Sequence, residues 1–123
     1  MKNRLFSLAA LAGASALLVT SPAWAHAHLV SSTPGANATV TASPKTITLT
    51  FSEKLVPAFS KFDLTMPEMS DMKMGVKTVL SADGKSIVGT PSAALPKGAY
   101  KIVWTAASAD GHKMNGEVAF KVG

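Results

Sequence analysis

The chain has 123 residues, 47% of them hydrophobic, with a formal net charge of +5 and no cysteine. This length suits a single domain, and the absence of cysteine excludes a disulfide framework and thiolate metal ligands. Every residue after Arg4 that is positively charged at pH 7 is a lysine, and these lysines are scattered singly along the chain. Because arginine makes the bidentate contacts that hold phosphates and bases, we expect no nucleic-acid partner.

The start of the chain has the three parts of a secretory signal peptide. Two basic residues precede an uncharged and mostly apolar run over residues 5–19, and small residues at Ala23 and Ala25 flank a predicted cleavage site. The apolar run is too short and too interrupted to span a membrane. We therefore predict that residues 1–25 are a signal peptide and that residues 26–123 form an exported domain that does not cross the membrane.

Cleavage after Ala25 would place His26 at the start of the mature protein. A free α-amino group, whose ordinary pKa is about 8, would then stand beside an imidazole whose ordinary pKa is about 6.5. These two nitrogens of one residue can close a chelate ring on a metal ion, whereas an internal histidine offers one donor. His26 is therefore the first candidate metal ligand.

Short strand-like segments separated by turn signals fill the rest of the chain. In residues 46–51 hydroxyl and apolar side chains alternate, so Ile47, Leu49 and Phe51 are expected to face a core. Segments of similar character lie at residues 29–32, 59–65, 75–80, 86–90, 100–105 and 118–122. About seven short strands without a long apolar helix predict an all-β domain, an antiparallel sandwich or barrel. Trp104 is expected to anchor its core.

Asp110 and His112 form a second group of candidate ligands. Residues two apart lie on one face of an extended segment, so these two side chains can converge. Together with the amine and imidazole of His26 they would supply three nitrogens and one oxygen, a set that favours Cu(II). Taken alone, Asp110-Gly111 is a turn signal, and a lone Asp-x-His is more often a turn than a pair of ligands.

Residues 66–74 contain four methionines in nine positions: Met66, Met69, Met72 and Met74. Thioethers at this density suit Cu(I), which prefers soft ligands. The alternative is one amphipathic turn of helix, with Met66, Met69 and Met72 packed on the sheet. Met74 lies off that stripe, and four adjacent flexible methionines would make a poorly specified core.

In the order of these features the chain resembles the CopC family of periplasmic copper-resistance proteins. The matching features are an N-terminal histidine, the strand end Phe51-Ser52-Glu53, the methionine cluster, and Tyr100 to Trp104 followed by Ser108-x-Asp110-x-His112 and Gly116. The resemblance covers essentially all of residues 26–123. It implies a Greek-key, Ig-like β-sandwich or barrel with a Cu(II) site at one end and, in some members, a Cu(I) site at the other.

The resemblance also implies which residues bind copper. By position His26, Asp110 and His112 would hold Cu(II), and Glu53 is a secondary candidate. The Cu(I) ligands carried over by position are Met66, Met69 and Met74.

One position in the methionine cluster departs from the two-site family pattern. Family members with a full Cu(I) site carry a histidine where this chain has Asp71, and a hard carboxylate is a poor Cu(I) ligand. Met72 could supply the missing donor, or the cluster could bind Cu(I) only weakly.

His28 is a further secondary candidate for Cu(II). It stands third from the free amine, so a copper ion could take that amine, two deprotonated amides and the His28 imidazole. Ala27 permits this because, unlike proline, it has an amide hydrogen. We favour the folded site, since the local chelate must strip two amide protons and pull Leu29 out of its strand.

The resemblance implies a non-enzymatic copper carrier or buffer of the periplasm, acting in copper resistance or homeostasis and delivering to a membrane or outer-membrane copper-handling protein. One alternative is a copper mono-oxygenase with a histidine brace, but Asp110 would crowd the coordination position that O₂ needs. With one tyrosine and Trp104, the mature chain also offers little for a flat sugar-binding surface. The other alternative is a metal-free Ig-like adhesion or assembly module.

Overall fold

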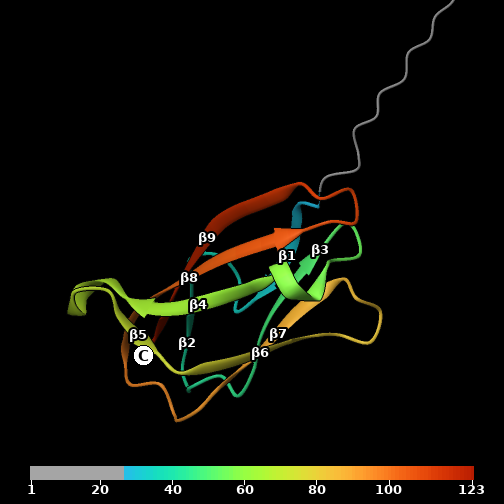
Figure 1. Cartoon of the computed structure of the whole chain (residues 1–123). Coiled ribbons are helices and arrows are strands. Elements are labelled where there is room, and N and C mark those ends of the chain that lie inside the picture. The colour runs from blue at the N-terminus through green and yellow to red at the C-terminus, as the bar shows by residue number, and fades with distance from the viewer. Residues whose placement is uncertain (1–26) are drawn as a thin grey trace, which may run out of the picture.

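A computed structural model describes residues 27–123. The predicted signal peptide and the candidate ligand His26 lie outside the described residues. The described chain forms nine strands and two single-turn 3₁₀ helices (Figure 1). Their bounds are β1 Leu29–Thr33, β2 Ala38–Val40, β3 Ile47–Phe51, η1 Pro57–Phe59, β4 Lys61–Met66, η2 Pro67–Met69, β5 Met72–Met74, β6 Val76–Leu80, β7 Ser86–Pro91, β8 Gly98–Ala107 and β9 Lys113–Val122.

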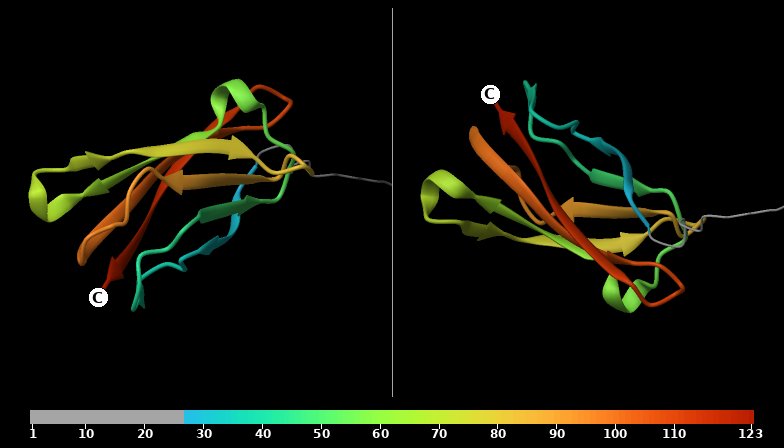
Figure 2. Two further views of the ribbon diagram at one scale, coloured as in Figure 1. Left: turned by 90° about the horizontal axis from the view of Figure 1, so that it is seen from below. Right: turned by 90° about the horizontal axis from the view of Figure 1, so that it is seen from above.

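The strands form two sheets packed face to face, as the views from below and from above in Figure 2 show. One sheet has the order β1-β3-β7-β6 and the other the order β2-β9-β8-β4-β5. In the described part of the chain every strand pair is antiparallel except β2, which runs parallel to β9. Consecutive strands such as β3 and β4 lie in different sheets. This confirms the predicted all-β, Greek-key sandwich.

The structure differs from the sequence prediction mainly in the lengths of the strands. Strands β2 and β5, three residues each, were not expected, and β8 and β9 are ten residues long because they continue to the tip of their hairpin. Phe59 was expected in a strand but ends η1 instead, because Pro57 begins a single 3₁₀ turn there. Of the described residues, none forms a helix long and apolar enough to cross a membrane.

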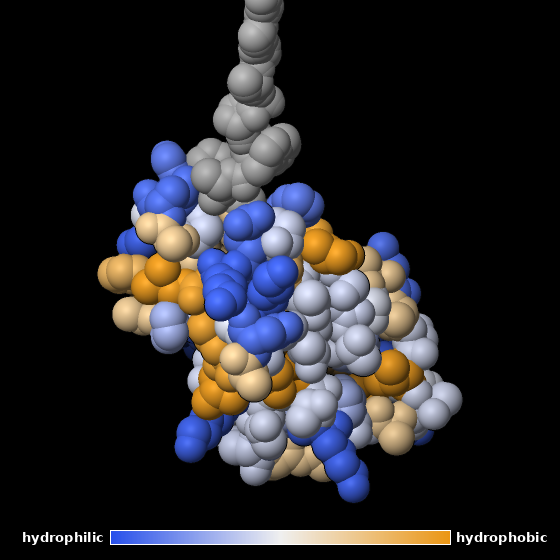
Figure 3. All heavy atoms as spheres, turned by 90° about the vertical axis from the view of Figure 1, so that its right-hand side faces the viewer, coloured by the Kyte–Doolittle hydropathy of each residue, from blue (hydrophilic) through white to orange (hydrophobic). Residues whose placement is uncertain are grey.

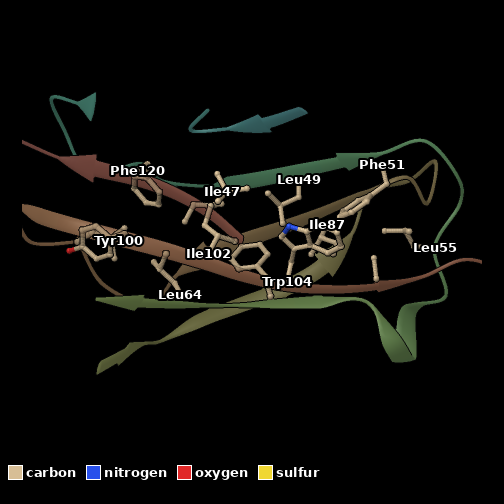
Figure 4. Packing of buried hydrophobic residues seen from close by; sticks show 14 of the residues in the cluster. Ile47, Leu49, Phe51, Leu55, Leu64, Ile87, Tyr100, Ile102, Trp104 and Phe120 are labelled. Carbon is tan, nitrogen blue, oxygen red and sulfur yellow. The ribbon is translucent and has the colours of Figure 1, made fainter. Parts of the chain in front are cut away.

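The core lies between the sheets and consists of the inward side of the predicted strands (Figure 4). Ile47 and Leu49 are fully buried and Phe51 is 2% exposed, as their alternation with hydroxyl residues predicted. Trp104 is 7% exposed, and its ring meets that of Phe51 edge-on with centroids 5.0 Å apart. Tyr100 stacks on another core ring. The expected role of Trp104 as a core anchor is confirmed.

Trp104 can occupy its place because the residue opposite it on β9 is Gly116. A Cβ atom at Gly116 would lie 2.6 Å from Cζ2 of the indole ring. Such a contact is shorter than the core could accept without moving the ring or the strand. The packing of Trp104 therefore requires a glycine at position 116.

The sandwich has two ends with different chemistry. At one end, which we call the methionine end (residues 66–74), η2 joins β4 to β5. At the other, the histidine end, the start of β1 lies with the loops at residues 52–55, 81–85 and 108–112. Figure 1 shows the turn between β4 and β5 projecting on the left, and the start of the described chain on the right with the β8–β9 hairpin.

Candidate metal centre

Asp110 and His112 lie in the turn between β8 and β9, and they contact each other directly. Asp110 Oδ2 is 2.8 Å from His112 Nδ1, and Asp110 Oδ1 accepts a hydrogen bond from the His112 backbone N–H at 3.1 Å. The Ser108 hydroxyl donates to the same Oδ1 at 2.6 Å. The turn closes through Gly111, whose φ of +91° suits glycine. The two candidate ligands are thus brought together, but by a tight turn and not by the extended segment that the sequence prediction assumed.

These hydrogen bonds define the charge of the turn. The hydrogen bond from Ser108, followed by those from His112, holds the pKa of the Asp110 carboxyl well below its usual range. An ionised carboxylate can only accept, so His112 Nδ1 carries the proton of this contact. A metal would then bind the ring through Nε2, with Asp110 orienting the imidazole, an arrangement common around metal-bound histidine.

His28 is tied to Ser52 at the start of β1. The His28 N–H donates to Ser52 Oγ at 3.1 Å, the Ser52 N–H donates to the His28 carbonyl at 3.0 Å, and His28 Nδ1 lies 3.1 Å from the same Oγ. Ala27, the preceding residue, is fully buried. A local chelate through the His28 amide would break these contacts and expose Ala27, so the structure adds a cost to that alternative.

Glu53, the secondary candidate, lies at the same end as Asp110. The two carboxylates line one open hollow of about 430 Å³. The complete lining is Ser52, Glu53, Lys54, Lys85, Ser108, Ala109 and Asp110. Figure 3 views this end of the molecule and shows hydrophilic side chains gathered between apolar areas. Ser52 therefore contacts His28 and also borders the hollow that contains Asp110.

Residues 27–123 by themselves do not complete a site of histidine, cysteine and carboxylate ligands. Within that range no group of three or more such side chains is placed to hold a metal ion. Asp110 and His112 are two of the predicted Cu(II) donors, and the remaining two belong to His26. The full Cu(II) ligand set therefore stays a prediction.

The four methionines of the other end fall into two pairs. Met66 is 8% exposed at the end of β4, where its Cε packs close to Gly98, and Met74 is partly buried against the core. Met69 and Met72 are 54% and 46% exposed. The first pair closes the end of the core, and the second pair is accessible from solvent.

The pairing of β4 with β5 sets the arrangement of these thioethers. Met66 pairs with Met72 and Leu64 with Met74, so Met66, Met72 and Met74 lie on one face of the sheet. Met69 belongs to the single turn η2. The alternative interpretation expected a turn of helix with Met66, Met69 and Met72 packed on the sheet. Of these three, only Met69 lies in the helical turn. Asp71 lies at the tip of the hairpin with a φ of +56°.

The sequence prediction named Ser52 and Ser108 only as members of matching motifs and gave them no role, whereas in the structure they position His28 and Asp110. The role of Ser108 could have been found, because serine and aspartate side chains often form hydrogen bonds within turns. Ser52 could not, because its partner lies 24 residues away in the chain.

Known proteins are similar in sequence to this chain along most of its length. Residues 29–123 match the family model of the CopC domain. Copper resistance protein C of Xanthomonas campestris pv. juglandis is 44% identical over 113 residues, which cover 88% of each chain. Copper resistance protein C of Escherichia coli is 40% identical over 120 residues, covering 93% of this chain and 94% of that protein.

Solved structures share the fold as well. The crystal structure of PcoC, a methionine-rich copper resistance protein from Escherichia coli, is 41% identical and matches with a TM-score of 0.74, covering 80% of this chain and all of that one. The structure of CopC from Methylosinus trichosporium OB3b is 28% identical, with a TM-score of 0.71 over 79% of this chain and 93% of that one. The chain belongs to the CopC family, whose members are copper-binding resistance proteins and not enzymes.

Proposed function

We propose that this protein is a periplasmic copper carrier or buffer that binds Cu(II) at its histidine end. The observation that carries the proposal is the pairing of Asp110 with His112 at 2.8 Å, in a hairpin turn at the end where β1 begins. This pairing holds the carboxylate ionised and turns His112 Nε2 toward metal binding.

The remaining donors would come from His26. It directly precedes Ala27 in the chain, and Ala27 is fully buried. The next residue, His28, is hydrogen-bonded to Ser52, which lines the hollow containing Asp110. The amine and imidazole of His26, His112 Nε2 and an Asp110 oxygen would form the tetragonal set that suits Cu(II). Asp110 would first have to leave its contact with His112 Nδ1, because a carboxylate held there cannot reach an ion bound at Nε2 of the same ring.

Glu53 and His28 have supporting places in this proposal. Glu53 lines the same hollow as Asp110, so it can compensate the charge of the ion or replace a ligand during exchange. His28 fixes the entry of β1 through Ser52. It would become a copper ligand only if that anchor were broken.

A Cu(I) site at the methionine end is the second part of the proposal. Met69 and Met72 present exposed thioethers, and Met74 lies on the same face of the sheet as Met72. Soft sulfur donors suit Cu(I) and need no deprotonation to bind it. Met66, the fourth candidate, would have to leave the core to take part.

The cellular setting follows from the predicted leader. Removal of residues 1–25 during export would both deliver the protein to the periplasm and create the His26 amine. A protein that holds copper there would pass it to a membrane or outer-membrane copper-handling partner.

The test uses the protein beginning with a native N-terminus at His26. Metal analysis and EPR should find one Cu(II) per chain in an environment of three nitrogens and one oxygen. Acetylating the amine should abolish tight binding, and unchanged binding would overturn the proposed ligand set. A turnover assay with ascorbate and peroxide tests the mono-oxygenase alternative, and absence of bound copper would favour the metal-free module.

A further inference from the structure

The hollow at the histidine end carries two lysines that the proposed copper site does not use. Lys54 and Lys85 line it together with Glu53 and Asp110, and both lysines are exposed. Their loops are held side by side, because the Leu55 N–H donates to the Gly84 carbonyl at 2.9 Å and the Phe51 N–H to the Lys85 carbonyl at 2.8 Å. The two ammonium groups therefore project from one hydrogen-bonded platform.

The charge of this hollow depends on copper. Without the metal, the two lysines balance the carboxylates of Glu53 and Asp110. Bound Cu(II) brings two positive charges, which exceed the one charge lost with the proton displaced from the amine, and so makes this end of the molecule more cationic. Asp83 stands beside Lys85, but its carboxylate accepts hydrogen bonds from Ser81 Oγ at 2.6 Å and the Lys85 N–H at 3.0 Å, within its own turn.

The lining also limits what the hollow can hold. Its seven residues are polar or charged except Ala109, and none is aromatic. A planar aromatic ligand would therefore find no ring on which to stack. The volume of about 430 Å³ suits a small organic acid, and ammonium groups at its edge suit carboxylates.

We propose that this hollow is a carboxylate subsite through which the protein receives Cu(II) from small anionic carboxylate chelates. Carboxylates of the incoming complex pair with Lys54 and Lys85 while copper exchanges ligands. A copper–oxygen bond to the chelate breaks as one to Asp110 forms, and no electron is transferred. The released carboxylate stays paired with the lysines until it diffuses away. This inference rests on the proposed Cu(II) site.

The experiment measures the rate of Cu(II) transfer by stopped flow from two donors, the anionic nitrilotriacetate complex and the neutral bis-glycinate complex. The test variant is Lys54→Gln/Lys85→Gln. The matched control is Lys45→Gln/Lys97→Gln, which removes the same charge from exposed positions that precede β3 and β8, at the far end of the sandwich. Lys54→Arg/Lys85→Arg keeps the charge.

The test variant should slow transfer from the anionic donor about tenfold at low salt, a size typical of electrostatic steering. Transfer from the neutral donor should change by less than about twofold. The control pair and the arginine pair should both keep the wild-type rate, and added salt should reduce the wild-type advantage. If the test variant fails to fold, the salt dependence of the wild-type protein decides: added salt should slow transfer from the anionic donor and leave transfer from the neutral donor unchanged, and an equal response to both donors would overturn the subsite.

Two results would overturn the subsite. Equal slowing with both donors would show that the lysines affect the site in general, and equal slowing by the control pair would show an effect of net charge alone. In both cases wild-type protein still takes up one Cu(II), and the proposed function stands. If wild-type protein takes up Cu(II) from neither donor, the proposed copper site fails and the subsite fails with it.

Discussion

The two ends of the sandwich hold their candidate ligands in different ways. At the histidine end Asp110 is fixed by hydrogen bonds from Ser108 and His112, and His28 by Ser52. At the methionine end the thioethers are placed by strand pairing and packing, with Met69 and Met72 exposed. A directed, charged site suits a hard or borderline ion with a fixed geometry, whereas flexible thioethers suit a soft ion with weak geometric demands.

This difference predicts that removing one donor has its largest effect at the histidine end. His112→Ala should lower Cu(II) affinity on the order of 100-fold or more, since even residues that only orient a metal ligand cost 10- to 100-fold. It should also abolish copper-induced stabilisation, because binding would no longer link the start of β1 to the β8–β9 hairpin. Competition with a chelator and thermal unfolding measure the two effects.

His28→Ala is the matched control for that experiment. It removes an imidazole from the same end but should lower Cu(II) affinity much less. If His28→Ala were the damaging change and His112→Ala bound normally, copper would be held by the local chelate. The spectrum would then show four nitrogens in place of three nitrogens and an oxygen.

Lowering the pH should affect copper affinity differently at the two ends, and this is the next largest effect. Cu(II) must displace a proton from the amine and compete with protons for both imidazoles, so its affinity should fall about tenfold or more per pH unit where these groups titrate. Cu(I) bound by thioethers should change little over the same range. Competition titrations at several pH values measure both ions, and a parallel loss for both would contradict the assignment of nitrogen and sulfur donors to separate ends.

The four methionines of the methionine end should divide into those that stabilise the fold and those that are accessible to a metal ion. Met66→Ala should destabilise the domain by about 2 kcal/mol or more, because it leaves a cavity beside Gly98. Met69→Ala should leave stability within about 0.5 kcal/mol, as expected for an exposed side chain, and weaken Cu(I) binding. Urea unfolding and Cu(I) competition measure these effects. Equal stability losses would show that the exposed methionine also packs.

Features that depend on neighbouring residues could be predicted from the sequence, whereas features that depend on residues far apart in the chain could not. The alternation of residues 46–51 is local and burial follows it directly, so β3 was predicted. Strand β5 was not, because Met72–Met74 is too short to signal a strand without its partner β4. Asp110 and His112 were expected to converge on an extended segment, whereas the tight turn through Gly111 produces their contact.

Contacts between distant loops were not predictable at the site. The Ser52 anchor joins residues 24 positions apart, and the hollow combines side chains from three loops. No local pattern of residue types predicts that side chains from separate loops will lie together. The exposure of Met69 and Met72 against the burial of Met66 likewise depends on where the hairpin ends, which packing decides.

The smallest expected effect concerns the metal-free protein in acid. The pKa of Asp110 is lowered in the folded state, first by the hydrogen bond from Ser108 and then by those from His112. A lowered folded pKa contributes stability above the unfolded value of about 4, and this contribution is lost as the pH falls toward the folded value. Because the carboxylate is exposed, solvent screening keeps the contribution small.

Asp110→Asn should therefore flatten the fall of the melting temperature below about pH 4. The matched control is Glu68→Gln, which removes one carboxylate from the methionine end. If the melting curves of these two variants shift identically with pH, the hydrogen bonds of the β8–β9 turn contribute nothing particular to stability. A flatter curve for Asp110→Asn alone would show that this turn is held in place before copper arrives, which is the property that sets the histidine end apart from the methionine end.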